Sequence, residues 1–546
     1  MSEYSGKSIK RLTSKAVRSL RSSNHSDAIE ITGEIIQRDP DHAGAHAIQF
    51  SSLFKSNQFE TARRMGGKAA ELNPKSVFIL NNQACLQLEA KQPAAAAGLL
   101  KSLIDQFGDR AQWLYNLALA QRMVGNFDYA IKTFHRTLSL KPDHGRAAFQ
   151  LADCLKSVGH HEEAVKAFDY VRLLRSKHSP THSNFIHHSV SNDSFTPIEL
   201  KQEIDLWGER FIPKDKRYKV GQIDHTSNIK FGFLIGVIPN EWLINMVAPV
   251  INQLSQGEDS VSVYWHDERI PTNIFDKSVN LVISSGLSDA DFARRVRNDK
   301  IDVMTDICGM RVGSRQRSLG LRLCSEQFGW LAHEGVYASP LITAIEEELD
   351  KQRFFISAEN RPKAQRPKPL DKAFIGIGCS RGIAYDVVKS WAYILHQLDD
   401  WRLLLDVKDN HVIQFIKHQF STVGIGNDRL VFDTKAGPTQ GSIVLDNFIN
   451  NEPVSAYSAI ESGGVLVALK GPLFPAQHTA ALLSQIGLDD WLCKSRAAYV
   501  ARALTLAQTK PGELSSATDT QLNASKVRNL ESFTAHFRDT IIKSKA

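Results

Sequence analysis

Apolar and polar positions in the first third of the chain follow a helical period that recurs. Leu12, Ala16, Val17 and Leu20 form the first apolar stripe. Small residues then recur every 34 positions, at Ala28, Ala62, Ala96, Ala130 and Ala164. Helix-ending residues recur with the same spacing, at Pro40, Pro74, Gly108 and Pro142. Two periodic sets in one register predict five helical hairpins over residues 9–178.

The 34-residue period is that of tetratricopeptide repeats. In such hairpins a small residue lets the second helix approach the first, and a large residue one turn later fills the remaining space. Leu100, Phe134 and Phe168 occupy that later position. Thr32 and Gly66 replace the aromatic residue in the first two repeats, as terminal repeats often deviate.

Stacked hairpins of this type form a concave surface that binds extended peptides. Asn82, Asn116 and Gln150 share one position on the first helix of consecutive repeats, again 34 residues apart. We predict that they form a ladder of amides able to hydrogen-bond a peptide backbone. The alternative is that they are ordinary surface residues of the repeat.

The repeat period stops after residue 178, and His, Ser and Asn dominate residues 177–194. This composition predicts a linker, followed by a bridging helix at about 196–211, so we assign 179–228 to a linker and bridging helix.

Short apolar runs alternate with amphipathic stretches beyond residue 228, which predicts α/β structure. The strongest runs lie at 229–238, 260–265, 279–284, 300–307, 326–332, 373–378, 401–407, 429–433, 442–446 and 464–469. A basic stretch with prolines, 361–372, separates two series of strands. We therefore predict two Rossmann-like lobes, 229–360 and 373–546, the second including a C-terminal helix. A cleft between strand ends of two such lobes is the GT-B glycosyltransferase layout.

Composition narrows the possible functions only slightly. The excess of 66 basic over 59 acidic residues is small and dispersed, so we expect no nucleic-acid partner. Six scattered cysteines without metal-ligand spacing predict reduced core thiols and no metal site. Because there is no 18-residue apolar run and no secretory signal pattern, we expect no membrane span and a cytoplasmic location.

Residues 306–335 carry a specific resemblance, to the glycine-turn region of the O-linked N-acetylglucosamine transferase and SPINDLY family. The matching positions are Gly309, Gly313, Arg315, Arg322, Gln327, Trp330, Leu331 and Gly335. The segments 389–405 and 461–492 are similar to the start and the end of that family's second lobe. Since the family also places tetratricopeptide repeats before its lobes, the resemblance covers essentially the whole chain.

The resemblance implies a nucleotide-sugar donor as substrate, no further cofactor, and a protein or peptide acceptor bound by the repeats. The sequence departs from the family at most donor contacts. The first-lobe histidines correspond to Glu241 and Asn245, and an arginine corresponds to Gln477. The His-Thr-Thr-Gly diphosphate cradle corresponds to Pro453–Ala456, and the expected second-lobe lysine is absent.

Five residues are candidates for donor binding. Gly309 and Arg315 retain the family's glycine-turn pattern, and Ser455 is the one polar residue at the cradle positions. Arg381 and Lys435 follow second-lobe strands, where a cation can face a phosphate. The alternatives are a simple turn for the glycine and solvated positions for the cations. The sequence singles out no catalytic residue.

Three hypotheses follow. The chain is a protein O-glycosyltransferase that transfers a sugar to Ser or Thr; or it is a degenerate transferase that serves as a scaffold or adaptor; or its cleft acts on a sugar recognised by other residues.

Overall fold

A computed structural model of the chain describes residues 7–191, 195–213, 215, 217–221, 228–236, 243–266, 273–310, 314–331, 341–344, 355–356, 372–379, 383–432, 438–510, 521–522, 525 and 527–543. The chain divides into two compact units, residues 1–155 and 156–546. None of the helices within these described ranges combines the length and the apolarity needed to span a lipid bilayer.

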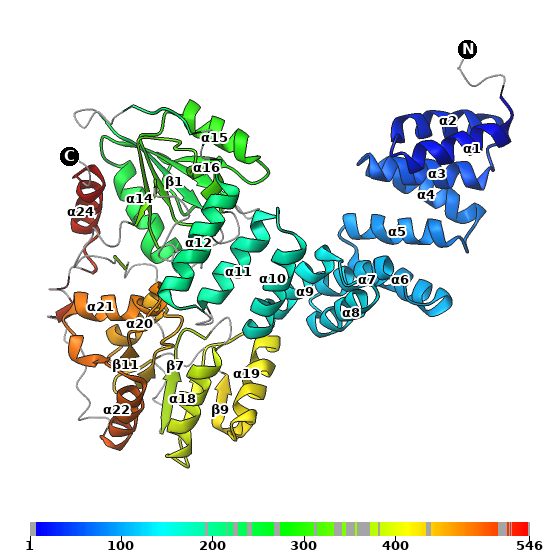
Figure 1. Cartoon of the computed structure of the whole chain (residues 1–546). Coiled ribbons are helices and arrows are strands. Elements are labelled where there is room, and N and C mark those ends of the chain that lie inside the picture. The colour runs from blue at the N-terminus through cyan, green and yellow to red at the C-terminus, as the bar shows by residue number, and fades with distance from the viewer. Residues whose placement is uncertain are drawn as a thin grey trace. The chain divides into compact units, whose positions relative to one another are not determined.

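Five helical hairpins occupy the predicted repeat region (Figure 1, blue to cyan). Their helices are α1 (Ile9–Arg21), α2 (His25–Arg38), α3 (Ala43–Lys55), α4 (Phe59–Leu72), α5 (Val77–Glu89), α6 (Pro93–Phe107), α7 (Ala111–Met123), α8 (Phe127–Leu140), α9 (Gly145–Ser157) and α10 (His161–Leu174). The boundary of the first compact unit falls near the end of α9, so α10 belongs to the second unit.

The periodic residues lie where the packing argument expects them. All five alanines of the 34-residue series are fully buried on α2, α4, α6, α8 and α10. Leu100, Phe134 and Phe168 are fully buried as well. Gly66 has a specific partner: a Cβ at this position would lie 3.1 Å from the ring of Phe50. Phe50 of α3 therefore fills the space that an aromatic residue fills in later repeats.

The linker predicted over 177–194 is wrong, because helix α11 (Ser179–Ser191) occupies most of it. This helix packs against α10 and against α12 (Pro197–Phe211). Phe185, Ile186 and Val190 provide its buried apolar positions, and its many Ser and His residues concealed this stripe in the sequence. The bridging helix α12 is confirmed and begins with a Thr196–Glu199 capping box.

The first lobe contains a parallel sheet, built among the described residues from six strands in the order β3-β2-β1-β4-β5-β6. The strands are β1 (Lys230–Ile235), β2 (Ser260–Trp265), β3 (Asn280–Ile283), β4 (Val303–Asp306), β5 (Glu326–Gly329) and β6 (Thr343–Ala344). The helices α14 (Ala248–Ser255), α15 (Asp289–Asn298) and α16 (Gln316–Leu319) connect them (Figure 1, green).

The second lobe repeats this topology, with described strands in the order β12-β11-β10-β7-β8-β9, all parallel. The strands are β7 (Ala373–Gly376), β8 (Arg402–Leu405), β9 (Leu430–Phe432), β10 (Ile443–Leu445), β11 (Val465–Leu469) and β12 (Leu492–Cys493). The helices are α18 (Tyr385–His396), α19 (Asn410–Thr422), α20 (Pro453–Glu461), α21 (His478–Ile486) and α22 (Arg496–Gln508). In chain order both lobes read 3-2-1-4-5-6, the doubly wound arrangement.

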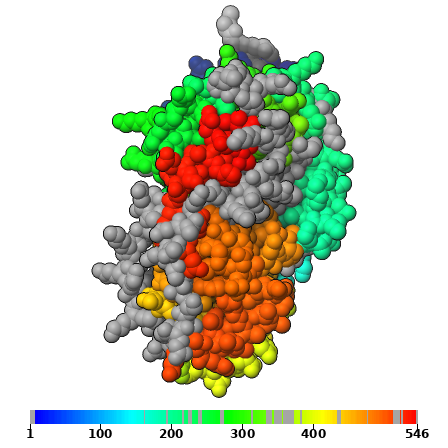
Figure 2. Space-filling model, turned by 90° about the vertical axis from the view of Figure 1, so that its left-hand side faces the viewer, coloured from blue at the N-terminus to red at the C-terminus, as the bar shows by residue number. Residues whose placement is uncertain are grey.

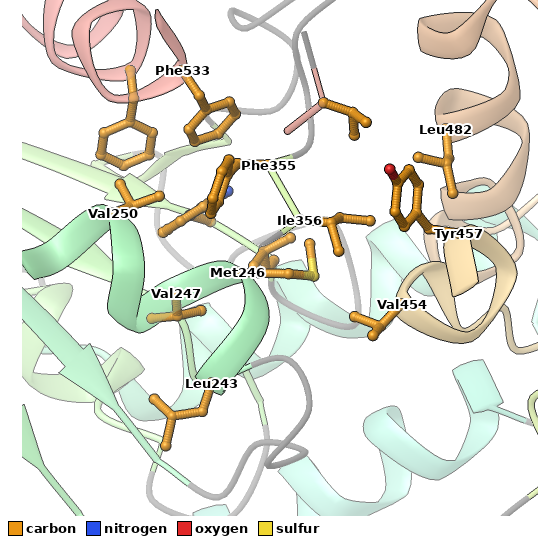
Figure 3. Close-up of a cluster of buried hydrophobic side chains, with 14 of the residues drawn as sticks. Leu243, Met246, Val247, Val250, Phe355, Ile356, Val454, Tyr457, Leu482 and Phe533 are labelled. Atoms are coloured by element: carbon orange, nitrogen blue, oxygen red, sulfur yellow. The ribbon is translucent and has the colours of Figure 1, made fainter. Parts of the chain in front are cut away.

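One apolar cluster draws residues from both lobes (Figure 3). The cluster includes Met246 of the first lobe and Val454, which lies on α20 of the second lobe. It also includes Ile356. We call this group the interlobe cluster. It joins the two sheets' helices through side chains that are almost fully removed from water, so it stabilises the pair of lobes by the hydrophobic effect.

The C-terminal helix α24 (Leu530–Lys543), which we assigned to the second lobe, packs on the first lobe. Figure 2 shows these C-terminal residues (red) lying over the first lobe (green). Phe537 stacks near Phe233 of β1 and lies 4.8 Å from Trp330, measured between ring centroids. Arg538 also forms an ion pair with the buried Asp259 at 2.6 Å. A helix pattern in sequence carries no information about which sheet it will cover.

Candidate functional site at the switch points of the two sheets

Each sheet has one place where the strand order reverses, between β1 and β4 in the first lobe and between β7 and β10 in the second. Connections leave these neighbouring strands toward opposite faces of the sheet, which opens a crevice at their carboxyl ends. Ligands of doubly wound folds bind in that crevice. The residues that follow β4, β7 and β10 therefore define the candidate site.

Asp306 ends β4 at the first-lobe switch point and is fully buried. Its carboxylate accepts hydrogen bonds from the backbone N–H groups of Cys308 at 2.9 Å and Gly309 at 3.3 Å. It also accepts one from Nε2 of Gln316 at 2.6 Å. Gly309 has a φ of +58°, so this turn uses the left-handed conformation that favours glycine. The candidate Gly309 thus lies at the switch point, in a turn that Asp306 holds.

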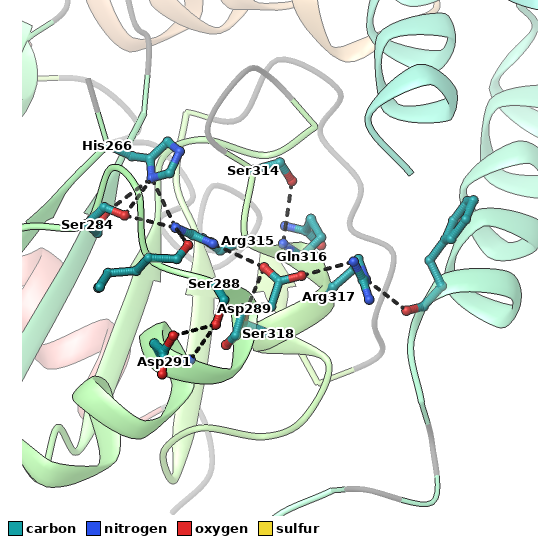
Figure 4. Close-up of polar contacts among 12 residues, drawn as sticks. His266, Ser284, Ser288, Asp289, Asp291, Ser314, Arg315, Gln316, Arg317 and Ser318 are labelled. Atoms are coloured by element: carbon teal, nitrogen blue, oxygen red, sulfur yellow. Dashed lines mark hydrogen bonds and ion pairs between the residues drawn. The ribbon is translucent and has the colours of Figure 1, made fainter. Parts of the chain in front are cut away.

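The side chain of Arg315 points into the first lobe (Figure 4). It is 5% exposed and donates to the backbone carbonyls of Ser284 and Leu287, each at 2.9 Å. It also forms an ion pair with Asp289 at 3.1 Å, contacts Nδ1 of His266 at 3.3 Å and lies over the ring of Phe292 at 5.0 Å. Arg315 therefore ties the loop after β3 to the glycine turn, and these described contacts all lie within the lobe.

Asp446 follows β10 at the second-lobe switch point and is fully buried. Its Oδ2 accepts a hydrogen bond from Nδ2 of Asn451 at 2.8 Å, whereas Oδ1 has no hydrogen-bond partner among the described residues. Burial raises the pKa of Asp446 to about 7, the side chain of Thr479 opposes the rise, and the charge of Glu452 adds to it. The Asp446 carboxyl group therefore binds a proton far more readily than an ordinary aspartate does.

Gly378 follows β7 and approaches the same place from the other side of the switch point. Its φ is +74°, and a Cβ there would lie 2.8 Å from the carbonyl oxygen of Asn450. Nδ2 of Asn447 donates to the Gly378 carbonyl at 2.9 Å, which links the two loops. Oδ1 of Asn451 accepts from the backbone N–H of Thr479 at 3.2 Å, which brings in α21.

Sequence reasoning did not find Asp446, Asn447 or Asn451 as site residues. The available signal was the run of Asp and Asn directly after an apolar strand of a parallel sheet, in the segment SIVLDNFINN. Gly378 stands in the segment GIGCSRG, whose glycine spacing does not match the G-x-G-x-x-G pattern of dinucleotide-binding sites. The sequence therefore provided no reason to select it.

Helix α20 begins at the positions that correspond to the family's diphosphate cradle. Pro453 and Val454 are buried, and Val454 belongs to the interlobe cluster (Figure 3). Pro453 also has no N–H to offer an anion. The candidate Ser455 lies half-buried in the first turn of this helix. Apolar packing thus replaces most of the polar cradle here.

Several carboxyl groups lie near the second-lobe switch point. Burial raises the pKa of the Cys379 thiol well above its ordinary value. Three carboxyl groups add to this rise: Asp446, Asp406 and Glu452. A diphosphate needs cations or free N–H groups, so these residues alone do not form a diphosphate site.

Arg381, Lys435, Gly313 and Glu241 lie outside the described residues. Asn245, the other residue at a family histidine position, is buried in the turn Leu243–Val247. Gln477, at the family's arginine position, donates from Nε2 to the Pro472 carbonyl at 3.0 Å.

The three predicted groove amides share one position on α5, α7 and α9. Asn116 is 5% exposed; its Nδ2 donates to Sγ of Cys85 at 3.3 Å, and its Oδ1 accepts from Gln112 at 3.1 Å. Asn82 and Gln150 are half-buried, and Nδ2 of Asn82 and Oε1 of Gln150 have no hydrogen-bond partner in the described structure. The three amides therefore share one helix position, but the side chain of Asn116 already forms hydrogen bonds within the helix stack.

A tetratricopeptide-type array followed by two Rossmann-type lobes defines the chain as GT-B-like, and comparison with known proteins confirms this predicted fold. A mutant form of the O-GlcNAc transferase from Thermobaculum terrenum superimposes with a TM-score of 0.70 at 18% identity, covering 85% of this chain and 98% of that one. No family model matches the sequence.

A relative in Eustoma exaltatum subsp. russellianum is described as a probable UDP-N-acetylglucosamine–peptide N-acetylglucosaminyltransferase SPINDLY. It is 22% identical over 255 residues, which are 41% of this chain and 28% of that protein. The chain therefore resembles the O-GlcNAc transferase and SPINDLY family both in sequence and in fold, as the sequence predicted.

Proposed function

We propose that this chain is a protein O-glycosyltransferase, in which the repeats bind a protein acceptor and the cleft transfers a sugar from a nucleotide donor to Ser or Thr. The observation that supports this most is the unpaired Oδ1 of the buried Asp446. Leaving a buried polar group without a hydrogen bond costs about 1–3 kcal/mol. Such a cost is explained if a ligand supplies the missing bond at the switch point.

The chemistry of this position suits a hydroxyl-rich ligand. A carboxyl group with a pKa of about 7 can both donate and accept a hydrogen bond near neutral pH. Gly378 keeps a side chain away from the same place. We infer that Asp446 contacts a sugar or ribose hydroxyl of the donor, and that the diphosphate is held by residues other than Pro453, Val454 and Ala456. Gly309, Ser455, Arg381 and Lys435 remain the candidates for those contacts.

A scaffold without turnover is the second candidate. It is favoured by the apolar residues of α20, which occupy the cradle positions and pack in the interlobe cluster. The negative charge around Asp446 favours it as well, because it opposes the binding of a diphosphate.

A transfer assay separates the two candidates. The purified full chain is incubated with cell extract and, in turn, with UDP-, GDP- and CMP-sugars, and intact-mass and peptide mass spectrometry detect added sugar on Ser or Thr. We expect one donor to give transfer that Asp446→Asn lowers at least about tenfold. Asp399→Asn, an exposed control, should leave it unchanged. If the wild-type protein transfers no sugar from any donor, the scaffold is the better description.

A further inference from the structure

The two helices of each repeat hairpin differ in charge. In the first four hairpins the first helices, α1, α3, α5 and α7, carry seven Lys and Arg residues against one carboxylate, Glu89. The second helices, α2, α4, α6 and α8, carry seven against seven. Because the first helices of consecutive hairpins contact one another, they form one continuous layer of the array. This first-helix layer carries the predicted groove amides Asn82 and Asn116, and it has a positive charge that the second helices lack.

A groove of about 640 Å³ lies on the first-helix layer in the first repeat. We call it the α1 groove, because it is lined by one face of α1 and by His42, which caps the start of α3. Ser14 lies on this face and occupies the repeat position of Asn82, two periods of 34 residues earlier in the chain. The α1 groove therefore lies on the side of the layer where we predict the groove amides.

Three exposed cations line the α1 groove: Lys10, Arg18 and Arg21. None of them forms an ion pair with a residue that the structure describes, and the described lining contains no carboxylate. The neighbouring Lys15, outside the groove, is in contrast paired with Asp27 at 3.7 Å. Like charges on one face of a helix repel each other until a partner of opposite charge neutralises them. This face of α1 therefore favours an anionic ligand.

Apolar side chains accompany these cations. Ile9 and Val17 are half-buried and line the same groove. Lys10 and Arg21 are 11 positions apart, which corresponds to about 16 Å along a helix. An extended polypeptide spans this distance with about five residues. The α1 groove thus suits an extended segment that places carboxylates against the cations and apolar side chains against Ile9 and Val17.

The distribution of charge favours a polypeptide over a nucleic acid. Beyond α1, the first helices of these four hairpins carry three charged residues, Lys55, Glu89 and Arg122. Arg122 is already paired with Asp153 at 2.6 Å. A nucleic acid carries a phosphate at every nucleotide and binds surfaces whose cations follow its whole path. A layer that is cationic at one end and polar or apolar beyond it matches an acidic protein segment instead.

We propose that the α1 groove binds an acidic, extended segment of a partner protein, with carboxylates paired to Lys10, Arg18 and Arg21. This inference rests on the protein binding that the proposed function assigns to the repeats, and it names the chemistry of the bound segment. It applies to the transferase and to the scaffold alike, because the sugar cleft takes no part in it. The positive first-helix layer also attracts acidic segments from a distance and so accelerates their binding.

The test uses two labelled peptides, one in which three Glu residues alternate with Val and one in which Gln replaces each Glu. Fluorescence anisotropy with the full chain measures their affinities without any nucleotide sugar, so the result is independent of the transfer assay. At about 0.05 M salt we expect the Glu peptide to bind at least about fivefold more tightly, as three exposed ion pairs predict. This preference should shrink at about 0.5 M salt. Equal affinity of the two peptides at low salt would overturn the proposal.

Two double variants with the same change in net charge locate the binding. Lys10→Glu with Arg21→Glu should remove the preference for the Glu peptide. Arg63→Glu with Arg64→Glu changes two exposed cations of α4 outside the groove and should preserve it. Circular dichroism verifies that each variant is folded. An unchanged preference in the folded Lys10 and Arg21 variant would refute the location, and an oligothymidylate that competes as strongly as the unlabelled Glu peptide would assign the groove to nucleic acid.

Discussion

At the scale of single residues, the two switch points differ in the hydrogen bonding of a buried carboxyl group. Asp306 accepts three hydrogen bonds and holds the glycine turn of the first lobe. Asp446 occupies the corresponding strand end of the second lobe and leaves one oxygen unpaired among the described residues. A fully satisfied carboxylate is explained by the fold, whereas an unsatisfied one is explained by a ligand.

Asp446 should make stability depend on pH in an unusual direction. Its pKa rises from 3.8 to about 7 on folding. Between these values the folded protein binds the extra proton, so stability falls as the pH rises from about 4 to 7 and is constant above 7. Asp446→Asn should remove this fall and raise the Tm most at pH 8. A Tm difference between variant and wild type that stays the same from pH 4 to pH 8 would contradict the raised pKa.

Arg315 should be a structural residue of the first lobe. Arg315→Ala removes the charged hydrogen bonds to the backbone carbonyls of Ser284 and Leu287 and breaks the ion pair with Asp289. We expect a loss of about 3 kcal/mol in the free energy of unfolding. Arg294→Ala, at an exposed ion pair, should cost less than about 0.5 kcal/mol. Urea titration followed by tryptophan fluorescence measures both. Equal losses would show that the Arg315 contacts are unimportant.

The glycine at position 66 illustrates what a repeat pattern can and cannot predict. The period placed the helices and the buried alanines, because those depend on local spacing. It marked Gly66 only as a deviation, whereas the structure shows that Phe50 of the neighbouring helix fills the space. The period within one series of helices does not reveal that a large residue on a neighbouring helix, here Phe50, compensates for a small one.

Placing the usual aromatic residue at position 66 should therefore lower the stability of the fold. In Gly66→Phe the new ring would compete with Phe50, and overpacking of this kind typically costs about 1–3 kcal/mol. The double variant Gly66→Phe with Phe50→Ala should recover part of the loss. Circular dichroism of thermal unfolding measures both proteins, and a single variant as stable as the wild type would disprove the packing explanation.

At the scale of elements, the least predictable features were those fixed by distant contacts. Most strands were predicted because they are short apolar runs. Helix α11 was missed because its buried stripe is short and surrounded by Ser and His. The site residues after β10 could not be grouped with Gly378, since 69 residues separate Asn447 from the glycine whose carbonyl it contacts.

The C-terminal helix α24 should be needed for the first lobe although it follows the second in the chain. Deleting residues 521–546 would expose the apolar surface around Phe233 and Trp330 and leave the buried Asp259 without Arg538. We expect faster amide exchange in β1 and β5, with exchange in β8 and β9 changed much less. Hydrogen exchange with mass spectrometry measures this, and a uniform increase in both sheets would contradict the assignment of α24 to the first lobe.

At the scale of the whole molecule, the chain combines an array of tetratricopeptide-type repeats with a pair of Rossmann-type lobes, for which we propose a donor site. The fold followed from the 34-residue period of the repeats and from the alternation of short apolar runs with amphipathic stretches beyond residue 228. The donor site did not follow, because apolar packing of α20 and the charge around Asp446 depend on the assembled sheet. The unpaired carboxyl oxygen of Asp446 at the second-lobe switch point is the reason to expect a nucleotide-sugar ligand.

Calorimetric titration of the full chain with UDP, GDP, CMP and the corresponding nucleotide sugars tests this central claim most directly. We expect at least one nucleotide sugar to bind, Asp446→Asn to weaken that binding at least about tenfold, and the exposed Asp399→Asn to leave it unchanged. Binding of no nucleotide or nucleotide sugar to the wild-type protein, with no shift in its Tm, would contradict the claim that the cleft is a donor site.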